Sequence, residues 1–216
     1  MQLSETPRTR LTRLSDRGRT EVEDLYAVLD AGLVGHLGLV RDGAPVVLPM
    51  GYGRRGDTLF LHGSTGAGWA HGLDGAAVCF TVTHVDGVVY ARSVFDHSLN
   101  YRCAVVLGTT RRVEDADDKW AALEAVTEQL APGSWSYARL PTKRELAATS
   151  VYSLDLTEAS VKVRNGPPHD EPEDVLAGGR WAGVLPIRTV FDAARPAPDL
   201  EQGPALPTHV GDRRQT

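Results

Sequence analysis

The sequence predicts a mainly β fold, a small antiparallel barrel of six strands with peripheral helices. Short apolar runs bounded by turn residues recur along the chain, a pattern typical of strands joined by hairpins. Glycine and proline are over-represented, with 22 and 13 copies among 216 residues, which indicates many turns. The one long helix comes late in the chain, so strands and helices do not alternate as they do in a dinucleotide-binding βαβ fold.

The N-terminal residues 1–16 predict an extended arm, because their arginines show no apolar period. Two interpretations of this arm remain, a frayed terminus and an arm that wraps a partner subunit. Residues 17–32 predict a helix, since apolar residues recur there at helical spacing. Asp16 is a suitable cap for its start, and Gly32 marks its end.

Six strands follow in hairpin order. Pro49 lies inside the second and indicates an edge strand or a break in the ladder, because proline has no N–H to donate. Gly108 indicates a bulge in the fifth strand, and a kink or turn is expected within the sixth. The predicted strands are 33–40, 44–52, 58–62, 76–84 with 88–91, 98–112, and 150–155 with 159–164, with turns at 41–43, 54–57 and 86–87.

Two helices and a tail complete the predicted domain. Residues 116–130 predict a helix with an apolar face and acidic residues in its first turn. Thr142 and Glu145 have the spacing of a capping box at the start of a short helix. Residues 191–216 are rich in proline and polar side chains and predict disorder. The folded domain is therefore expected over residues 17–190.

Composition excludes several functional classes. The formal net charge of −5 argues against non-specific binding of nucleic acid, which needs a basic surface. No apolar stretch is long enough for a membrane span, and no secretory signal is visible at the N-terminus. Two cysteines cannot form a disulfide framework, so a cytoplasmic protein is expected.

The glycine-rich segment 63–68 is a candidate binding loop. It follows a strand, and the hydroxyls of Ser64 and Thr65 with nearby N–H groups suit a phosphate, although an ordinary flexible loop is equally open. His62 precedes the loop and is placed to bond a ligand. Arg102 would add a bidentate phosphate donor, or form a salt bridge.

Motifs for other chemistries are missing from the sequence. The seven histidines show no metal-ligand spacing, so no metal site is predicted. No nucleophile elbow occurs, and no catalytic residue is predicted.

Four segments together resemble the pyridoxamine 5′-phosphate oxidase-like, FMN-binding split-barrel superfamily, and most closely its nitroimidazole-reductase-like branch. These segments are 46–52, 59–64, 78–82 and 98–102, with a further match at 181–186. The resemblance extends from Glu21 to Gly183. It implies a six-stranded antiparallel split barrel, FMN as the cofactor, and a homodimer with two equivalent cofactor sites at its interface.

The resemblance also implies which residues bind the cofactor. In such proteins the flavin lies along one strand, its phosphate lies by the glycine-rich segment, and a further strand lies close to the ring. The matching positions are Leu48, Pro49, Met50, Gly51, Tyr52, His62, Gly63, Ser64, Thr65, Trp69, Asn100, Tyr101, Arg102 and Cys103.

Trp69 departs from the family pattern. It stands where family members usually carry a lysine or arginine that meets the phosphate. Arg102, Arg41, Arg54 or Arg55 would have to compensate, or the pocket takes a deazaflavin or haem instead. Trp69 itself would stack on a ring or pack as an apolar interface residue.

The expected function is that of an FMN-dependent oxidoreductase that reduces a small electron-poor substrate. The alternatives are a non-catalytic flavin, deazaflavin or haem binding protein, acting as a carrier or sensor, and a barrel that has lost its ligand. The sequence shows no basic cluster for a second phosphate, which argues against pyridoxamine-phosphate oxidation itself.

Overall fold

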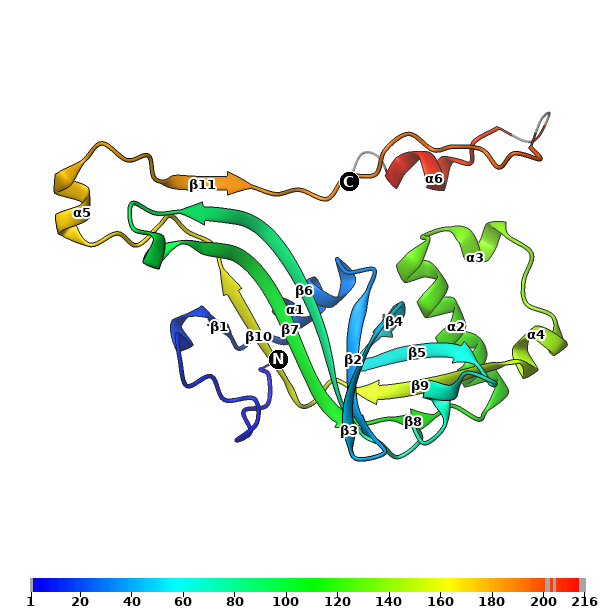
Figure 1. The fold of residues 1–216 in the computed structure, drawn as a ribbon. Helices are drawn as coiled ribbons and strands as arrows, with labels where there is room; N and C mark the ends of the chain where they lie inside the picture. Colours follow the sequence, from blue (N-terminus) through cyan, green and yellow to red (C-terminus); the bar gives the residue numbers. More distant parts are fainter. Residues whose placement is uncertain (1, 201–202, 204, 214–216) are drawn as a thin grey trace. The chain divides into compact units, whose positions relative to one another are not determined.

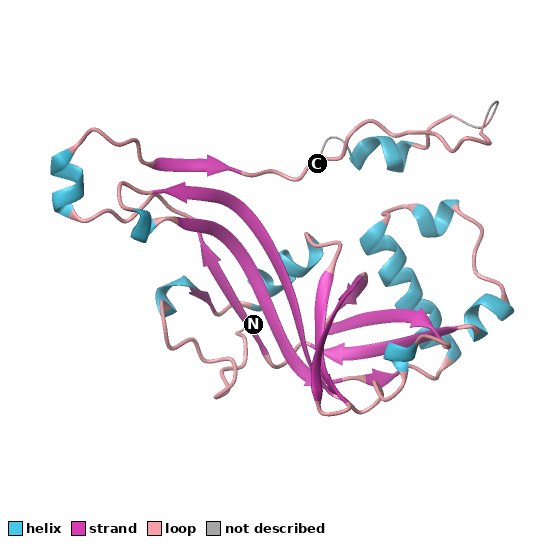
Figure 2. Ribbon diagram, viewed as in Figure 1, coloured by secondary structure: helices cyan, strands magenta, loops and turns pink. Residues whose placement is uncertain are grey.

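The computed structural model describes residues 2–200, 203 and 205–213. The chain forms two compact units, each built around one antiparallel sheet (Figures 1 and 2). Unit 1 comprises residues 1–50, 76–109 and 155–188, and unit 2 comprises residues 51–75, 110–154 and 189–216.

Unit 1 holds a seven-stranded sheet in the order β1-β10-β7-β6-β2-β3, with β11 paired to β6 beyond the end of β2. Its strands are β1 (Gly18–Arg19), β2 (Gly35–Arg41), β3 (Ala44–Met50), β6 (Ala77–Tyr90), β7 (Ser98–Thr109), β10 (Ala159–Arg164) and β11 (Gly183–Pro186). Its helices are η1 (Ser15–Arg17), α1 (Val22–Asp30), η3 (Val94–Asp96) and α5 (Pro172–Ala177).

The core of unit 1 lies between α1 and one face of this sheet. Phe80 on β6 is fully buried, as are Leu25 and Leu29 on α1. The ring of Phe80 lies directly over Gly35, where an added Cβ would come within 2.1 Å of the ring carbon Cζ. Only glycine therefore fits at the start of β2.

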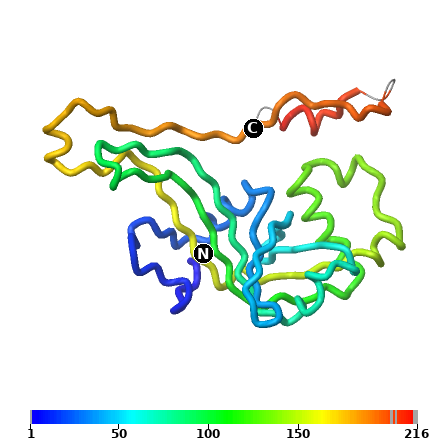
Figure 3. The backbone as a smooth tube through the Cα atoms, in the orientation of Figure 1, coloured from blue at the N-terminus to red at the C-terminus, as the bar shows by residue number. Residues whose placement is uncertain are grey.

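The long β6–β7 hairpin extends past the strands beside it (Figure 3). Asp86–Gly87 was a predicted turn, and this prediction is wrong, because β6 continues through these residues with a shift in register. The chain reverses instead at η3. β11 then pairs with Gly87–Tyr90 on the free edge of β6.

Unit 2 holds a four-stranded sheet in the order β4-β5-β9-β8, with α2 packed against β4 and β5. Its strands are β4 (Tyr52–Arg55), β5 (Thr58–Ser64), β8 (Arg111–Arg112) and β9 (Thr149–Asp155). Its helices are η2 (Gly68–Ala70), α2 (Ala116–Leu130), α3 (Ser134–Tyr137), α4 (Lys143–Ala147) and α6 (Thr208–Asp212).

The predicted helices are confirmed, with one boundary corrected. α2 spans the predicted residues, and α4 begins with the predicted capping box between Thr142 and Glu145. The first helix starts at Val22, with Glu21 at its N-cap. Asp16 lies in η1 and does not cap it.

Several strand boundaries also differ from the prediction. Pro49 lies on the edge strand β3, as predicted, and the ladder breaks after it at Gly51. Residues 54–55 continue β4, so only the last part of the predicted turn at 54–57 is a turn. Gly108 pairs regularly with Val78, and the strand is interrupted at Thr110 instead.

The last predicted strand proves to be two. β9 pairs with β5 and β8 in unit 2, whereas β10 pairs with β7 and β1 in unit 1. The kink expected between residues 155 and 159 is therefore the passage of the chain from one sheet to the other.

The N-terminal segment lies against its own unit. Its Thr6 hydroxyl and Arg8 guanidinium both donate to the carboxylate of Glu158. Lys162 on β10 donates to the carbonyl of Arg13.

The tail contains α6 in its described part, and Arg213 donates to the Leu130 carbonyl at the end of α2. Positions 201–202, 204 and 214–216 of the predicted disordered tail lie outside the described residues. Among the described residues, no helix combines the length and apolar character needed to cross a bilayer.

Candidate binding face and pocket

The predicted flavin strand is divided between the two units. Leu48, Pro49 and Met50 end β3 in unit 1, and Tyr52 opens β4 in unit 2. The Tyr52 side chain is only 1% exposed, so its ring belongs to the core of unit 2. Any ligand contact at this position must therefore use the backbone. Gly51 is exposed, with open space where a side chain would be.

The outward face of the unit 1 sheet carries uncharged side chains in register. His36 on β2 is opposite Pro49 on β3 and Thr81 on β6, and Thr81 is opposite Val105 on β7. Side chains alternate along a strand, so these residues lie on the face opposite to buried Phe80. We call this surface the outer face.

A second row of the outer face has the same character. Gly38 on β2 is paired with Val47 on β3 and Cys79 on β6, and Cys79 with Leu107 on β7. Val47 is 64% exposed, and neither row contains an aspartate, glutamate, lysine or arginine. These two rows therefore form an uncharged part of the outer face, of the kind that a planar ring or another protein covers, whereas the next row pairs Cys103 with Lys162 on β10.

The strand segment Asn100–Cys103 serves structural roles at two positions. Asn100 is buried and holds the loop after β10, accepting from Arg164 and from the Gly166 N–H. Arg102 donates twice to the Asp86 carboxylate, at 2.9 Å each. Of the two roles predicted for Arg102, the structure therefore shows the salt bridge and not a free phosphate donor.

Tyr101 and Cys103 are both half-buried on β7. Burial raises the pKa of the Cys103 thiol, and the backbone hydrogen bond and charge at Lys162 lower it by less. The thiol is therefore protonated at neutral pH and adds no charge to the outer face.

The glycine-rich segment differs from the predicted anion loop. β5 continues through Gly63 and Ser64. The N–H groups that follow already have acceptors: Thr65 donates to the Ala148 carbonyl at 3.0 Å, and Gly66 to the Ser64 hydroxyl oxygen at 3.2 Å. The segment can offer a phosphate its hydroxyl groups more readily than its backbone.

Trp69 packs over Gly63. An added Cβ at Gly63 would lie 2.2 Å from Cζ2 of the indole, and the tilted ring of Tyr152 lies 6.3 Å from Trp69. Within unit 2, Trp69 therefore acts as a packing residue between β5 and β9.

We expect Gly63→Ala to lower the free energy of unfolding by about 1–3 kcal/mol, because the indole must move to admit the methyl group. Gly66→Ala is the matched control, since its Cβ would make only ordinary contact with Ser64. Urea unfolding of both variants measures the difference. Equal stability of the two variants would contradict the packing described for Trp69.

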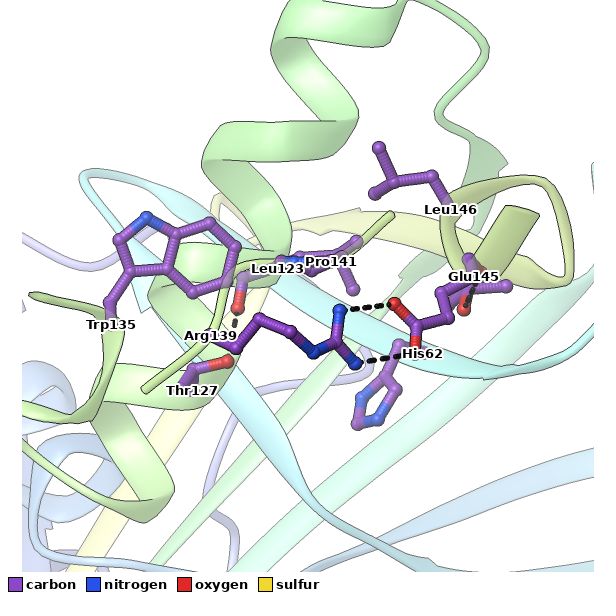
Figure 4. Close-up of a pocket in the computed structure, with 9 residues that line it drawn as sticks. His62, Leu123, Thr127, Trp135, Arg139, Pro141, Glu145 and Leu146 are labelled. Carbon is purple, nitrogen blue, oxygen red and sulfur yellow. Dashed lines mark hydrogen bonds and ion pairs between the residues drawn. The ribbon is translucent and has the colours of Figure 1, made fainter. Parts of the chain in front are cut away.

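A pocket of about 260 Å³ lies in unit 2 between β5 and the helices that follow α2 (Figure 4). His62 contributes from β5, and Trp135 contributes from α3. The remaining lining residues are Leu123, Thr127, Arg139, Pro141, Glu145, Leu146 and Thr149. Of the predicted site residues, only His62 lines it.

An ion pair borders this pocket. Arg139 donates to both oxygens of Glu145, at 3.0 and 2.7 Å, as the dashed lines in Figure 4 show. Glu145 also accepts from the N–H and hydroxyl of Thr142, at 2.7 and 2.9 Å. The hydrogen bond from Arg139 is the largest of the causes that lower the pKa of Glu145 from 4.5 to about 2.

This pKa predicts how α4 responds to acid. A carboxyl whose pKa is depressed on folding stabilises the fold fully above its unfolded pKa of about 4.3, and that stabilisation is lost as pH falls through the folded value. A carboxyl ¹³C titration should therefore show the Glu145 midpoint near 2. A midpoint near the unfolded value would contradict the ion pair and cap.

His62 borders the same pocket with a neutral ring. Burial lowers the pKa of its imidazole, so the uncharged form predominates at neutral pH. No hydrogen bond to its ring nitrogens is recorded among the described residues. The pocket residues on α2, α3 and the loop before α4 had no predicted site role. Glu145 on α4 was predicted only as part of a helix cap.

Comparisons with known proteins place the chain among flavin-related folds. A family described as pyridoxamine 5′-phosphate oxidase matches residues 21–163. A search of curated proteins finds no match.

Among solved structures, the chain is 41% identical to a FAD and heme binding protein from Mycobacterium smegmatis, with a TM-score of 0.88 over 92% of this chain and 97% of that chain. It is 35% identical to the flavocytochrome Anf3 from Azotobacter vinelandii, with a TM-score of 0.90 over 96% of each chain. A putative 5-nitroimidazole antibiotic resistance protein from Bacteroides thetaiotaomicron shares the fold at 19% identity, with a TM-score of 0.57 over 68% of this chain and 86% of that chain.

Proposed function

The chain belongs to the pyridoxamine 5′-phosphate oxidase family and has its split-barrel fold, and from this membership we propose that it is a flavin-dependent oxidoreductase that reduces a small electron-poor substrate. We further propose that it acts in the cytoplasm, where its two unpaired cysteines stay reduced.

The outer face is the observation that carries this proposal. A flavin ring is planar and largely apolar, and it needs a flat surface without competing charges. Gly38 has no side chain and so adds nothing that stands above that surface. The same uncharged surface suits a second copy of the chain, which supports a homodimer with the flavin at its interface.

FAD fits this chain better than FMN. The terminal phosphate of FMN is close to a dianion, whereas each phosphate of FAD is a diester with one charge, so FAD depends less on a dedicated cation. Trp69 supplies no cation, and Arg102 is already paired with Asp86. The relative at 41% identity is described as binding FAD.

From family membership we propose that the hydroxyl groups of Ser64 and Thr65, at the end of β5 in unit 2, bind the phosphates. Of the arginines considered as compensating cations, Arg41 lies 3.7 Å from the Asp42 carboxylate and Arg54 donates to the Gly56 carbonyl. Arg55 is exposed and remains the best candidate cation.

Bound flavin would supply the hydride or electron chemistry, and this chain would bind and orient it. The proposal is tested by anaerobic reduction of the purified holoprotein with NADH or NADPH, followed by oxidation with a small electron-poor acceptor. We expect bleaching and recovery of the flavin absorbance over repeated cycles. Bound flavin that no donor and acceptor pair turns over would favour a carrier or sensor instead.

A second candidate function is that of a flavin and haem protein. Two solved relatives above 30% identity are described as a FAD and heme binding protein and as a flavocytochrome. Histidine usually binds haem iron through the unprotonated nitrogen of a neutral imidazole. Deazaflavin is the third cofactor that the sequence left open. Mass spectrometry of the molecule released on denaturation would identify it.

The structure narrows the candidate haem ligands. His97 accepts from the Ala91 N–H through Nδ1 at 3.2 Å, so Nε2 carries the proton of the neutral ring. His84 donates from Nε2 to the Val28 carbonyl at 3.0 Å, which leaves Nδ1 free as a ligand atom. The candidate ligands are therefore His84 and the histidines whose rings have no hydrogen bond or ring contact among the described residues, namely His36, His62, His71 and His169.

Reconstitution with haemin tests this second function. We expect a Soret band that one alanine substitution among these five histidines abolishes and that His209→Ala leaves unchanged. A Soret band that survives all five substitutions would contradict histidine ligation from this set.

A further inference from the structure

The pocket in unit 2 has no net charge. Arg139 and Glu145 neutralise each other, and the low pKa of the His62 imidazole leaves that ring uncharged at neutral pH. No other lining residue is ionisable. A ligand ion would therefore find an unpaired charge of opposite sign in the pocket only if it displaced Arg139 or Glu145 from their ion pair.

Displacement of Glu145 is disfavoured by the way α4 begins. The carboxylate accepts from the backbone and the side chain of Thr142 as well as from Arg139, and it forms the capping box of the helix. An incoming anion would thus enter next to a fixed carboxylate. Arg139, by contrast, has N–H groups beyond those that bond Glu145 and Leu140.

The remaining lining suits an aromatic ring. Trp135 supplies an indole, which Trp120 holds in an edge-to-face contact at 5.1 Å between ring centres, and Leu123 and Leu146 supply apolar walls. Pockets for drug-sized ligands have volumes of about 300 Å³ or more. The pocket volume of about 260 Å³ is smaller and suits one substituted ring.

We propose that this pocket binds an uncharged, single-ring aromatic molecule that carries a hydrogen-bond acceptor. The ring packs between Trp135 and the leucine walls, and its acceptor takes a hydrogen bond from Arg139 or His62. This binding site goes beyond the proposed oxidoreductase function and does not depend on it.

Three probes of one shape and different charge test the selectivity. Benzamide, benzoate and benzylamine are titrated into the purified full-length protein at neutral pH by calorimetry. We expect benzamide to bind about threefold more tightly than either ion, since each ion leaves a charge unbalanced beside an ion pair that is half or more exposed and therefore screened. Equal binding of the three, tighter binding of an ion, or no binding of benzamide overturns the proposal.

Charge variants test the mechanism of that selectivity. Glu145→Gln keeps a capping-box residue and leaves Arg139 unbalanced, so preference should shift to benzoate. Arg139→Gln should shift it to benzylamine, and the double variant should restore preference for benzamide. An unchanged ranking in all three variants would mean that the probes bind elsewhere.

A filling variant locates the site without changing charge. Leu123→Trp should abolish benzamide binding by occupying the pocket, whereas Leu130→Trp places the same side chain at an exposed position of the same helix. Circular dichroism confirms that both variants fold, and equal binding by both overturns the assignment. Because calorimetry needs no flavin turnover, an inactive protein that still binds benzamide contradicts the proposed function and leaves the site intact.

Discussion

The Phe80→Ala variant should lose about 3–5 kcal/mol of unfolding free energy, which is the usual cost of truncating a fully buried phenylalanine. Phe80 lies in the middle of the unit 1 sheet, between β2 and β7, and its ring fills the space over Gly35. Truncation removes this contact and leaves a cavity against α1 that cannot collapse without moving β2.

Phe95→Ala is the matched control, because Phe95 is 92% exposed near the end of the long hairpin. Its unfolding free energy should change by no more than about 0.5 kcal/mol. Both free energies are measured by urea unfolding, and the dependence of the free energy on urea concentration should be the same in both variants. A loss below about 1 kcal/mol for Phe80→Ala would show that the core of unit 1 lies elsewhere.

The Val47→Asp variant should lose both the flavin and the second subunit. Val47 is exposed on the outer face, so the substitution does not disturb the core. A covering ring or subunit would bury the new carboxylate without a partner, at a cost of several kcal/mol. Because 1.4 kcal/mol corresponds to tenfold in affinity, we expect at least about hundredfold weaker binding.

Val190→Asp places the same charge at another exposed valine, which belongs to unit 2. The two variants are compared by light scattering for mass and by the ratio of flavin to protein absorbance. If Val47→Asp retains both its flavin and the mass of a dimer, the proposal that the outer face binds them is wrong.

Local patterns predicted the elements whose causes are local. The capping box at Thr142 fixed the start of α4, and Asp115 with the acidic turn after it fixed the start of α2. Pro49 marked an edge strand because its missing N–H is a property of that residue alone.

The errors arose where a distant residue decides the conformation. Asp86–Gly87 has the same Asp-Gly hairpin signal as the turn at Asp42–Gly43, yet β6 continues through it. Asp86 is held by Arg102 on the neighbouring strand, and β11 covers the edge at Gly87 from almost a hundred residues away. Neither partner is visible in a local window of sequence.

The site was predictable only in part for the same reason. The resemblance pointed to His62 and the end of β5, where the pocket has one wall. The opposite wall comes from α2, α3 and α4. The pairing of Arg139 with Glu145 depends on a loop between two short helices, for which the sequence carries no spacing signal.

The absorbance spectrum of the purified protein, with mass spectrometry of whatever denaturation releases, tests the central claim most directly. The account predicts a yellow protein that releases FAD at about one molecule per chain, with FMN as the lesser alternative. A colourless protein whose melting temperature neither FAD nor FMN raises would contradict it, since a ligand at 100 times its dissociation constant adds about 2.7 kcal/mol of stability.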